Sequence, residues 1–84
     1  MLKDSTVIAL CSAVALALKQ ERLRKKLSMN ALAQRSGLSQ QMVSYVERGL
    51  RTPTLDTIFR MSLALEVDLD VILRRAMKES RRSM

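Results

Sequence analysis

Apolar residues recur every three or four positions along most of the chain, which is the spacing of helices that bury one side. Short polar or glycine-containing breaks divide this pattern into five segments. We therefore expect helices at about residues 5–26, 29–36, 40–48, 55–65 and 69–79. The buried side of the fourth segment is expected to contain Leu55, Ile58, Phe59 and Ala64 or Leu65.

The breaks carry residues that start and stop helices. Residues whose side chains can cap a helix N-terminus precede or open each segment: Asp4 or Ser5, Ser28, Ser39, Thr54 and Asp68. Gly37 and Gly49 follow the second and third segments, and glycine takes the left-handed conformation that ends helices without strain. Residues 79–84, ESRRSM, are polar and charged enough to fray.

The composition predicts an all-α fold. Apolar residues make up 48% of the chain and aromatic residues only 2%, with two glycines and one proline, which is typical of a compact helical domain. A chain of 84 residues builds one core, so residues 1–84 are expected to form a single domain.

The N-terminal segment has the outline of a secretory signal. Lys3 precedes a largely apolar stretch at residues 7–18, and Ala15 and Ala17 give an A-x-A pattern. The stretch is too short to span a bilayer, and the helical pattern continues without a break through KQERLRKK. We interpret the segment as a core helix.

Residue chemistry argues against an enzyme or a metal protein. The chain has no histidine, no calcium-loop arrangement of acids and no nucleophile beside a base, so we expect no cofactor and no small-molecule ligand. The single Cys11 cannot form an internal disulfide and is expected to be a small buried residue, which fits the reducing cytoplasm.

The charge favours a polyanionic partner. Fifteen Lys and Arg against eight Asp and Glu give a net charge of +7 and a pI near 10.6. Nucleic acid, an anionic membrane and simple solubility remain open on charge alone.

Residues 29–48 have the pattern of a helix-turn-helix. Ala33 is small where a second helix must cross closely, and Gly37 makes the turn. Leu38, Val43 and Val46 are apolar where the second helix must face the core. The joint spacing is more specific than any one of these residues.

The third segment separates its residues into two arcs at about 100° per residue. One arc is apolar and consists of Met42, Val43 and Val46. The opposite arc is polar and consists of Gln40, Gln41, Ser44, Tyr45 and Arg48. A solvated helix face is usually rich in Lys and Glu, whereas the glutamine, serine and tyrosine side chains of this arc are uncharged and can donate to and accept from base edges. This polar arc favours DNA as the partner.

The stretch LSMNALAQRSGLSQQMVSYVERGLRTPTLDTIFRMSLALEVDLDVIL resembles the phage-repressor and Cro type (lambda-repressor-like, XRE-type) helix-turn-helix family. The resemblance includes ERG after the third segment, Pro53, and the LALEV ending at residues 63–67. It implies a compact five-helix DNA-binding domain, here with an extended first helix.

The resemblance also implies site residues. The third helix of such proteins enters the major groove, which assigns base contacts to Gln40, Gln41, Ser44 and Tyr45. A structural ion pair is expected between Arg22 and Glu47. Phosphate contacts are expected from Ser28, Asn30, Arg35, Arg48 and Arg51.

Three positions depart from the family pattern. Met29 stands where a glutamine often touches a phosphate. Lys26 and Glu66 stand where glycines are common, so a left-handed backbone there would carry strain.

Such proteins usually bind palindromic DNA as homodimers. Apolar residues of the fifth segment suit a dimer interface, namely Leu69, Val71, Ile72 and Met77, together with the upstream part of the first helix. The alternative is a larger core between the two terminal helices. The basic end of the chain, with Arg74, Arg75, Lys78, Arg81 and Arg82, can add nonspecific DNA attraction or simply be solvated.

The first hypothesis is thus a sequence-specific, homodimeric transcription regulator that binds double-stranded operator DNA, either a phage-type repressor or a restriction-modification controller protein. An antitoxin that also binds its operator is one alternative. A membrane-surface or partner-helix docking module is another, but it does not explain Ala33, Gly37 or the polar arc.

Overall fold

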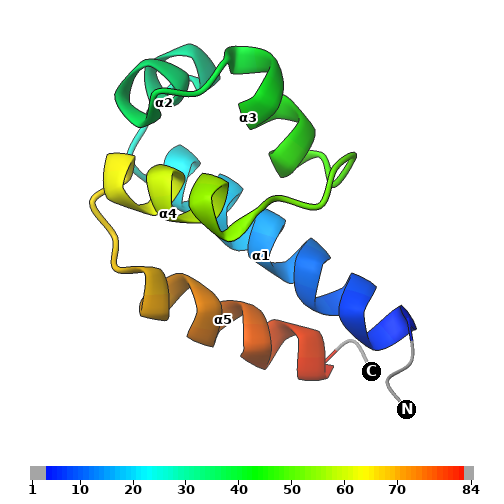
Figure 1. The fold of residues 1–84 in the computed structure, drawn as a ribbon. Coiled ribbons are helices and arrows are strands. Elements are labelled where there is room, and N and C mark those ends of the chain that lie inside the picture. Colours follow the sequence, from blue (N-terminus) through cyan, green and yellow to red (C-terminus); the bar gives the residue numbers. More distant parts are fainter. Residues whose placement is uncertain (1–3, 83–84) are drawn as a thin grey trace.

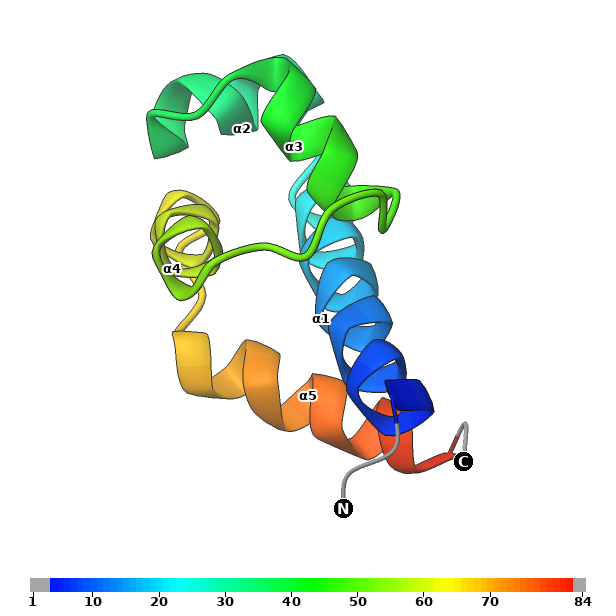
Figure 2. The same cartoon turned by 45° about the vertical axis from the view of Figure 1, so that its right-hand side comes forward.

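The computed structural model describes residues 4–82, which form five α-helices (Figure 1). These are α1 (Asp4–Arg24), α2 (Met29–Ser36), α3 (Gln40–Glu47), α4 (Leu55–Ala64) and α5 (Leu69–Arg82). Helix α5 packs antiparallel along α1. Helices α2 and α3 form the opposite end of the molecule, and α4 lies between them and α5 (Figure 2). The all-α expectation is confirmed.

The helix ends differ from expectation mainly at α5. Its helical backbone continues to Arg82, so the fraying expected for residues 79–82 is wrong. Ser80 is buried there, and its hydroxyl donates to the carbonyl of Met77 at 3.0 Å. Packing against α1 thus extends the helix beyond what its polar sequence suggests. Residues 83–84 lie outside the described part of the chain.

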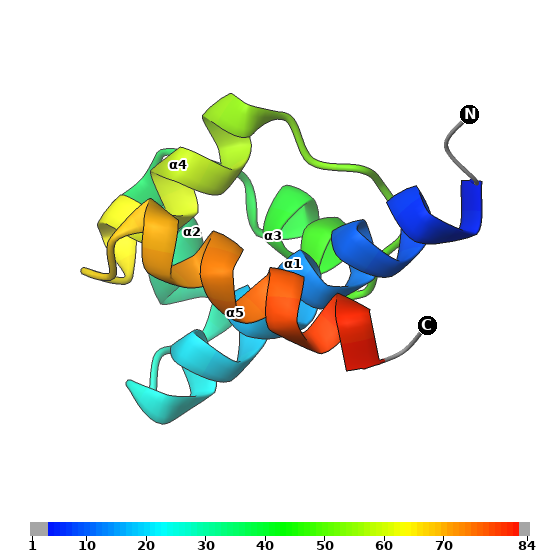
Figure 3. The ribbon, with the colours of Figure 1, turned by 90° about the horizontal axis from the view of Figure 1, so that it is seen from below.

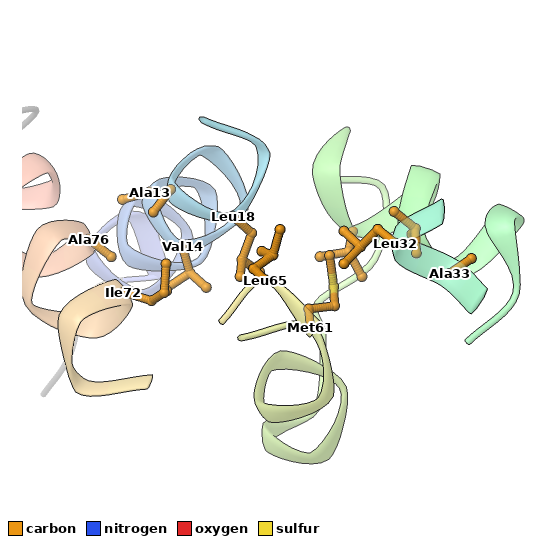
Figure 4. Close-up of a cluster of buried hydrophobic side chains, with 12 residues drawn as sticks. Ala13, Val14, Leu18, Leu32, Ala33, Met61, Leu65, Ile72 and Ala76 are labelled. Carbon is orange, nitrogen blue, oxygen red and sulfur yellow. The ribbon is translucent and has the colours of Figure 1, made fainter. Parts of the chain in front are cut away.

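The core is a row of apolar side chains that extends from the α1–α5 pair to α2 and α3 (Figure 4). Its fully buried members come from all five helices and the end of α4: Leu18, Leu32, Val43, Val46, Met61, Leu65, Ile72 and Ala76. Ala13 of α1 lies beside Ala76 of α5 in this cluster, which also contains Ala17, and the small size of these residues lets the two helices approach closely.

The outer side of α4 does not join this core. Ile58 packs against the core and Leu65 is fully buried, as expected. Leu55 and Phe59 were expected beside them but are 67% and 48% exposed, because they lie around the helix from the buried row and no described segment covers them. Cys11, expected to be buried, is partly exposed.

Four helices end in the same way. The residues after α1, α2, α3 and α4 take left-handed φ angles: Lys26 (58°), Gly37 (74°), Gly49 (70°) and Glu66 (56°). The amide that follows each of them donates to a carbonyl five residues earlier: Leu27 to Arg22, Leu38 to Ala33, Leu50 to Tyr45 and Val67 to Ser62. This is the Schellman pattern, and it satisfies carbonyls that the helix leaves unpaired. Lys26 and Glu66, which stand where the family often has glycine, thus take the left-handed backbone in spite of their side chains.

Three helix starts are capped as expected. The side chains of Ser28, Ser39 and Thr54 accept hydrogen bonds from Ala31, Met42 and Thr57 amides at 3.0, 3.0 and 3.1 Å. Asp68 precedes α5, where its backbone carbonyl accepts from the amides of Val71 and Ile72.

A buried carboxylate fastens α5 to α1. Glu21 is only 3% exposed and accepts hydrogen bonds from Arg24 of its own helix and, at 3.1 Å, from Nη1 of Arg75 in α5. The hydrogen bond from Arg24 lowers the pKa of Glu21; burial opposes the shift, and Arg75 adds to it. The second guanidinium nitrogen of Arg75 reaches Gln20 at 3.3 Å.

Lys25 connects the C-terminal ends of α1 and α4, because its ammonium donates a hydrogen bond to the carbonyl of Leu65, which follows α4. A cation is favourable at that end of a helix. Within residues 4–82, no helix has the length and apolar character needed to cross a membrane.

Candidate nucleic-acid interface

The turn between α2 and α3 is built by the residues that the sequence singles out. Ala33 is 3% exposed, Gly37 takes φ 74°, and Val43 and Val46 are fully buried. A Cβ at position 37 would lie 3.5 Å from Arg60 Nη1, so the backbone angle and not crowding makes glycine favourable here. These features fix one side of α3 against the core.

The opposite side of α3 faces outward at the edge of the molecule (Figure 2). Gln40, Gln41 and Arg48 are exposed, while Ser44 and Tyr45 are half-buried. The polar arc therefore carries uncharged glutamine, serine and tyrosine side chains that can form hydrogen bonds, and an arginine at its C-terminal end. Its chemistry matches base edges better than it matches an apolar partner.

Tyr45 contacts two other members of the predicted site. Gln41 Nε2 donates to the Tyr45 hydroxyl at 2.6 Å. The guanidinium carbon of Arg51 lies 5.1 Å from the centroid of the Tyr45 ring, which is a cation–π distance. The four-residue spacing of Gln41 and Tyr45 permits the first contact, but the second depends on the path of the loop after α3.

An ion pair fastens the end of α3 to α1. Arg22 Nε and Nη2 donate to Glu47 Oε2 and Oε1 at 2.7 and 2.9 Å, and both side chains are almost fully buried. The third nitrogen, Nη1, donates to the carbonyl of Leu27 at 2.8 Å in the turn before α2. One guanidinium thus joins α1, α3 and the turn between α1 and α2.

The predicted phosphate-binding residues lie in three places. Ser28 and Asn30 lie at the N-terminus of α2, where amides and the helix dipole favour an anion. Arg48 and Arg51 are exposed at the end of α3 and in the loop that follows. Arg35 lies in the last turn of α2, about 10 Å along the helix axis from its start. The structure brings Arg51, but not Arg35, against a base-reading candidate.

The expected dimer residues of α5 do not share one surface. Ile72 is fully buried in the core beside Val14 and Ala76, so its assignment to the interface is wrong (Figure 4). Val71 is 37% exposed but lies about 160° around the helix from Leu69. The crossing of α1 over α5 at its small residues decides which α5 positions are covered.

Leu69 and Met77 do share a side of α5, with the partly buried Leu73 between them. Leu69 lines a shallow apolar hollow with Leu55 and Phe59 of α4. Met77 lines a second one with Val7 and Leu10, where the apolar side of α1 continues past the core. We name these six residues the α4–α5 face: Val7, Leu10, Leu55, Phe59, Leu69 and Met77.

The basic end of α5 lies on the other side of α1 from α3 (Figure 1). Arg74 pairs with Asp70 at 3.0 Å, Arg75 with Glu21, and Arg82 with Glu79. In Figure 1 α3 lies above α1 and α5 lies below it, and the view from below in Figure 3 shows α5 in front of α1 with α3 behind. No group of three potential metal ligands occurs among residues 4–82.

Comparison with solved structures gives several matches along nearly their whole length. The wild-type restriction-modification controller protein C.Esp1396I superposes with a TM-score of 0.78 at 31% identity, over 83% of this chain and 92% of that chain. The same controller as a tetramer in complex with its natural 35 base-pair operator gives 0.79 at 30% identity, over 86% and 95%. The controller protein C.AhdI from Aeromonas hydrophila gives 0.69 at 33% identity, over 75% and 94%.

Sequence comparison points the same way. An HTH-type transcriptional regulator of Mycobacterium tuberculosis is 41% identical over 59 residues, which is 70% of this chain but only 42% of that protein. Another from Sinorhizobium fredii is 44% identical over 46 residues, 55% of this chain and 60% of that protein. The chain thus spans less than two thirds of the length of these relatives.

The helix-turn-helix family model matches residues 18–72, from the middle of α1 into α5. That range contains the whole α2–turn–α3 unit and the buried ion pair that holds it. The chain belongs to the helix-turn-helix family of the phage-repressor and Cro type, whose members are DNA-binding transcriptional regulators and not enzymes.

Proposed function

We propose that this chain is a sequence-specific transcriptional regulator that binds a palindromic DNA operator as a homodimer, with α3 in the major groove. The observation that carries the proposal is the two-sided character of α3. Its inner side is held by Val43, Val46 and Glu47, and its outer side presents uncharged hydrogen-bonding groups. A helix that is fixed behind and polar in front can enter a groove in a defined orientation.

Base reading falls to Gln40, Gln41, Ser44 and Tyr45. A glutamine amide can donate to N7 and accept from N6 of adenine, while a serine hydroxyl serves either role. The Tyr45 ring and hydroxyl can pack on a thymine methyl or bind an acceptor. Ser44 and Tyr45 are half-buried, so the two glutamines are the most exposed of these four residues.

Phosphate binding falls to the start of α2, at Ser28 and Asn30, and to Arg48 and Arg51 after α3. Helix amides and guanidinium groups on either side of a recognition helix fix its register on the duplex. Arg35 is a further candidate; because it lies in the last turn of α2, it would contact a different phosphate from the one bound at the start of that helix.

The homodimer would form through the α4–α5 face. Its α4 and α1 members are exposed large apolar side chains that line two apolar hollows, with Leu55 at 67%, Phe59 at 48% and Val7 at 48% exposed. A second copy of the chain related by a twofold axis covers the same residues on both protomers. One short recognition helix reads too few bases to define a site, whereas two read a palindrome.

A restriction-modification controller is the role that the comparisons favour over a phage-type repressor. Controller proteins match this chain over more than nine tenths of their own length, and one of them is described as a tetramer on its operator. We propose a cytoplasmic protein that acts without cofactor or small-molecule ligand, with DNA and its own second copy as partners.

Selection of bound fragments from a pool of random duplexes tests the proposal. We expect enrichment of an inverted repeat whose half-site centres lie about one helical turn apart. The Gln40→Ala variant should relax the base preference at one position of each half-site, whereas Gln34→Ala, an exposed glutamine on α2, should leave the selected sequence unchanged. Recovery of unrelated sequences by the wild-type chain would refute sequence-specific binding.

A further inference from the structure

Tyr45 holds two predicted DNA-contacting residues at once. Its hydroxyl accepts a hydrogen bond from Gln41 Nε2 at 2.6 Å, and its ring lies 5.1 Å from the guanidinium carbon of Arg51. Gln41 and Arg51 are exposed, whereas Tyr45 is half-buried against the body of the protein. The tyrosine is therefore the best anchored of the three.

We propose that Tyr45 is a specificity-determining positioning residue, which orders Gln41 and Arg51 before DNA arrives and so couples base reading to phosphate binding. This role rests on the proposed function, because it concerns the same α3 surface. It differs from that proposal in treating these three residues as one unit and not as independent contacts.

The hydrogen bond limits what Gln41 can present. One N–H of its amide is directed at the Tyr45 hydroxyl, which leaves the second N–H and the carbonyl oxygen for DNA. That remaining donor–acceptor pair matches N7 and N6 of adenine. A free glutamine must lose its rotamer freedom on binding, whereas this one has already lost part of it.

The ring and backbone of Tyr45 together hold the loop after α3. The amide of Leu50 donates to the Tyr45 carbonyl at 2.9 Å, so the residue before Arg51 is tied to Tyr45 through the main chain. The guanidinium of Arg51 then lies over the ring of the same residue. Arg51 thus has a defined position beside α3, although it is on an exposed loop.

The first test uses the protein without DNA. Tyr45 is the only tyrosine and the chain has no tryptophan, so intrinsic tyrosine fluorescence reports on this ring alone. Arg51→Gln should raise the acrylamide quenching constant of the wild-type chain, because the ring loses its cover. Lys19→Gln, which removes an exposed cation of α1, should not. Equal quenching in the Arg51→Gln and wild-type chains overturns the ordering of Arg51.

The second test measures binding to the selected operator and to its single-base variants. Tyr45→Phe keeps the ring and removes the hydroxyl, so it should lose discrimination at the base pair read by Gln41, by roughly tenfold. Gln41→Ala should lose the same discrimination, and the double variant should lose no more than either single variant. Circular dichroism of each variant checks that the helices are kept.

The outcomes separate this role from the function on which it rests. Wild-type selection of a palindrome with additive effects of Tyr45→Phe and Gln41→Ala overturns the positioning role and leaves the regulator intact. Failure of the wild-type chain to select any sequence overturns both. Non-additive loss at one base pair, together with the quenching change, supports the coupled unit.

Discussion

Arg22 and Glu47 form a bidentate ion pair, with Nε–Oε2 and Nη2–Oε1 separations of 2.7 and 2.9 Å. Both side chains are almost fully buried. Glu47 is the last residue of α3 and is buried like Val43 and Val46, so the pair lies on the buried side of this helix and not on its polar arc. Because two parallel hydrogen bonds fix both distance and angle, it constrains how α3 is presented. Its net contribution to stability is a separate matter, since burial of two charges costs about as much as their attraction returns.

Removal of one partner should therefore be severe. Glu47→Gln leaves the Arg22 guanidinium buried without its counter-charge, and we expect a loss of about 3–5 kcal/mol in the free energy of unfolding. Urea denaturation followed by circular dichroism measures it. Asp70→Asn breaks an exposed pair with Arg74 on α5 and should cost less than about 1 kcal/mol. Similar losses for the two variants would contradict a buried role for Glu47.

Acid stability should depend on Glu21. Its pKa is lowered in the folded chain by Arg24 first and Arg75 second, so the folded state binds a proton less readily than the unfolded state. The stabilisation is therefore complete above the ordinary carboxyl pKa of 4.5 and is lost as the pH falls below it. The free energy of unfolding of Glu21→Gln should therefore decrease less than that of the wild-type chain as the pH is lowered from neutral to below 4.5, as measured by urea denaturation at each pH.

The matched control is Glu79→Gln, which alters an exposed carboxylate on α5. Its profile should follow the wild-type chain through the same range. If Glu21→Gln retains the full wild-type pH dependence, the Glu21 cluster is not the source of acid sensitivity.

Self-association should depend on the α4–α5 face. Phe59→Lys and Met77→Lys each place a charge on apolar surface that the second copy would cover, and each should raise the dimer dissociation constant at least tenfold. Sedimentation velocity over a range of concentrations measures this. Val71→Lys, on the other side of α5, should have little effect. A wild-type chain that stays monomeric at high micromolar concentration, or equal effects of all three variants, would exclude this face.

Two helix ends can be relieved of strain. Lys26 and Glu66 adopt φ angles of 58° and 56°, where a side chain costs about 1–2 kcal/mol. Glycine removes this cost but loses about 0.5–1 kcal/mol through the entropy of the unfolded chain. Glu66→Gly and Lys26→Gly should thus stabilise by up to about 1.5 kcal/mol each in thermal or urea unfolding. Lys19→Gly, within α1, should instead destabilise by about 1 kcal/mol.

The salt dependence of DNA binding should distinguish the two basic ends of the molecule. Arg51→Gln should reduce the slope of log K against log salt by about 0.9 for each phosphate that is no longer neutralised. Arg81→Gln should leave the slope unchanged, because the end of α5 lies opposite α3 (Figure 1). Titration of a labelled duplex between low and moderate salt gives both slopes. An equal reduction for Arg81→Gln would indicate that DNA reaches α5.

Local signals account for most of what the sequence predicted. Ser28, Ser39 and Thr54 cap their helices by reaching amides three residues ahead, and Gly37 stops α2 by its own backbone freedom. Such features need no knowledge of the tertiary structure. The left-handed backbone at Lys26 could be anticipated only because the family resemblance aligned it with a glycine.

The errors arose where packing decides. Ile72 and Val71 are adjacent apolar residues, yet one is fully buried and the other is 37% exposed, because α1 crosses only one side of α5. Leu55 and Phe59 follow the helical period of α4 but lie outside its covered side. The contact of Arg51 with Tyr45 depends on a loop path that residue patterns do not specify.

The repeated Schellman endings have a consequence for how this scaffold can diverge. Each of the four helices α1 to α4 stops through hydrogen bonds to carbonyls of its own last turn, so the stop does not depend on the length of the connection that follows. The connection at residues 51–53, between the Schellman ending of α3 and the Thr54 cap of α4, can therefore gain or lose residues while both helices keep their registers. In such a scaffold, evolution or engineering can rewrite the loop that meets the DNA backbone without redesigning the helices around it.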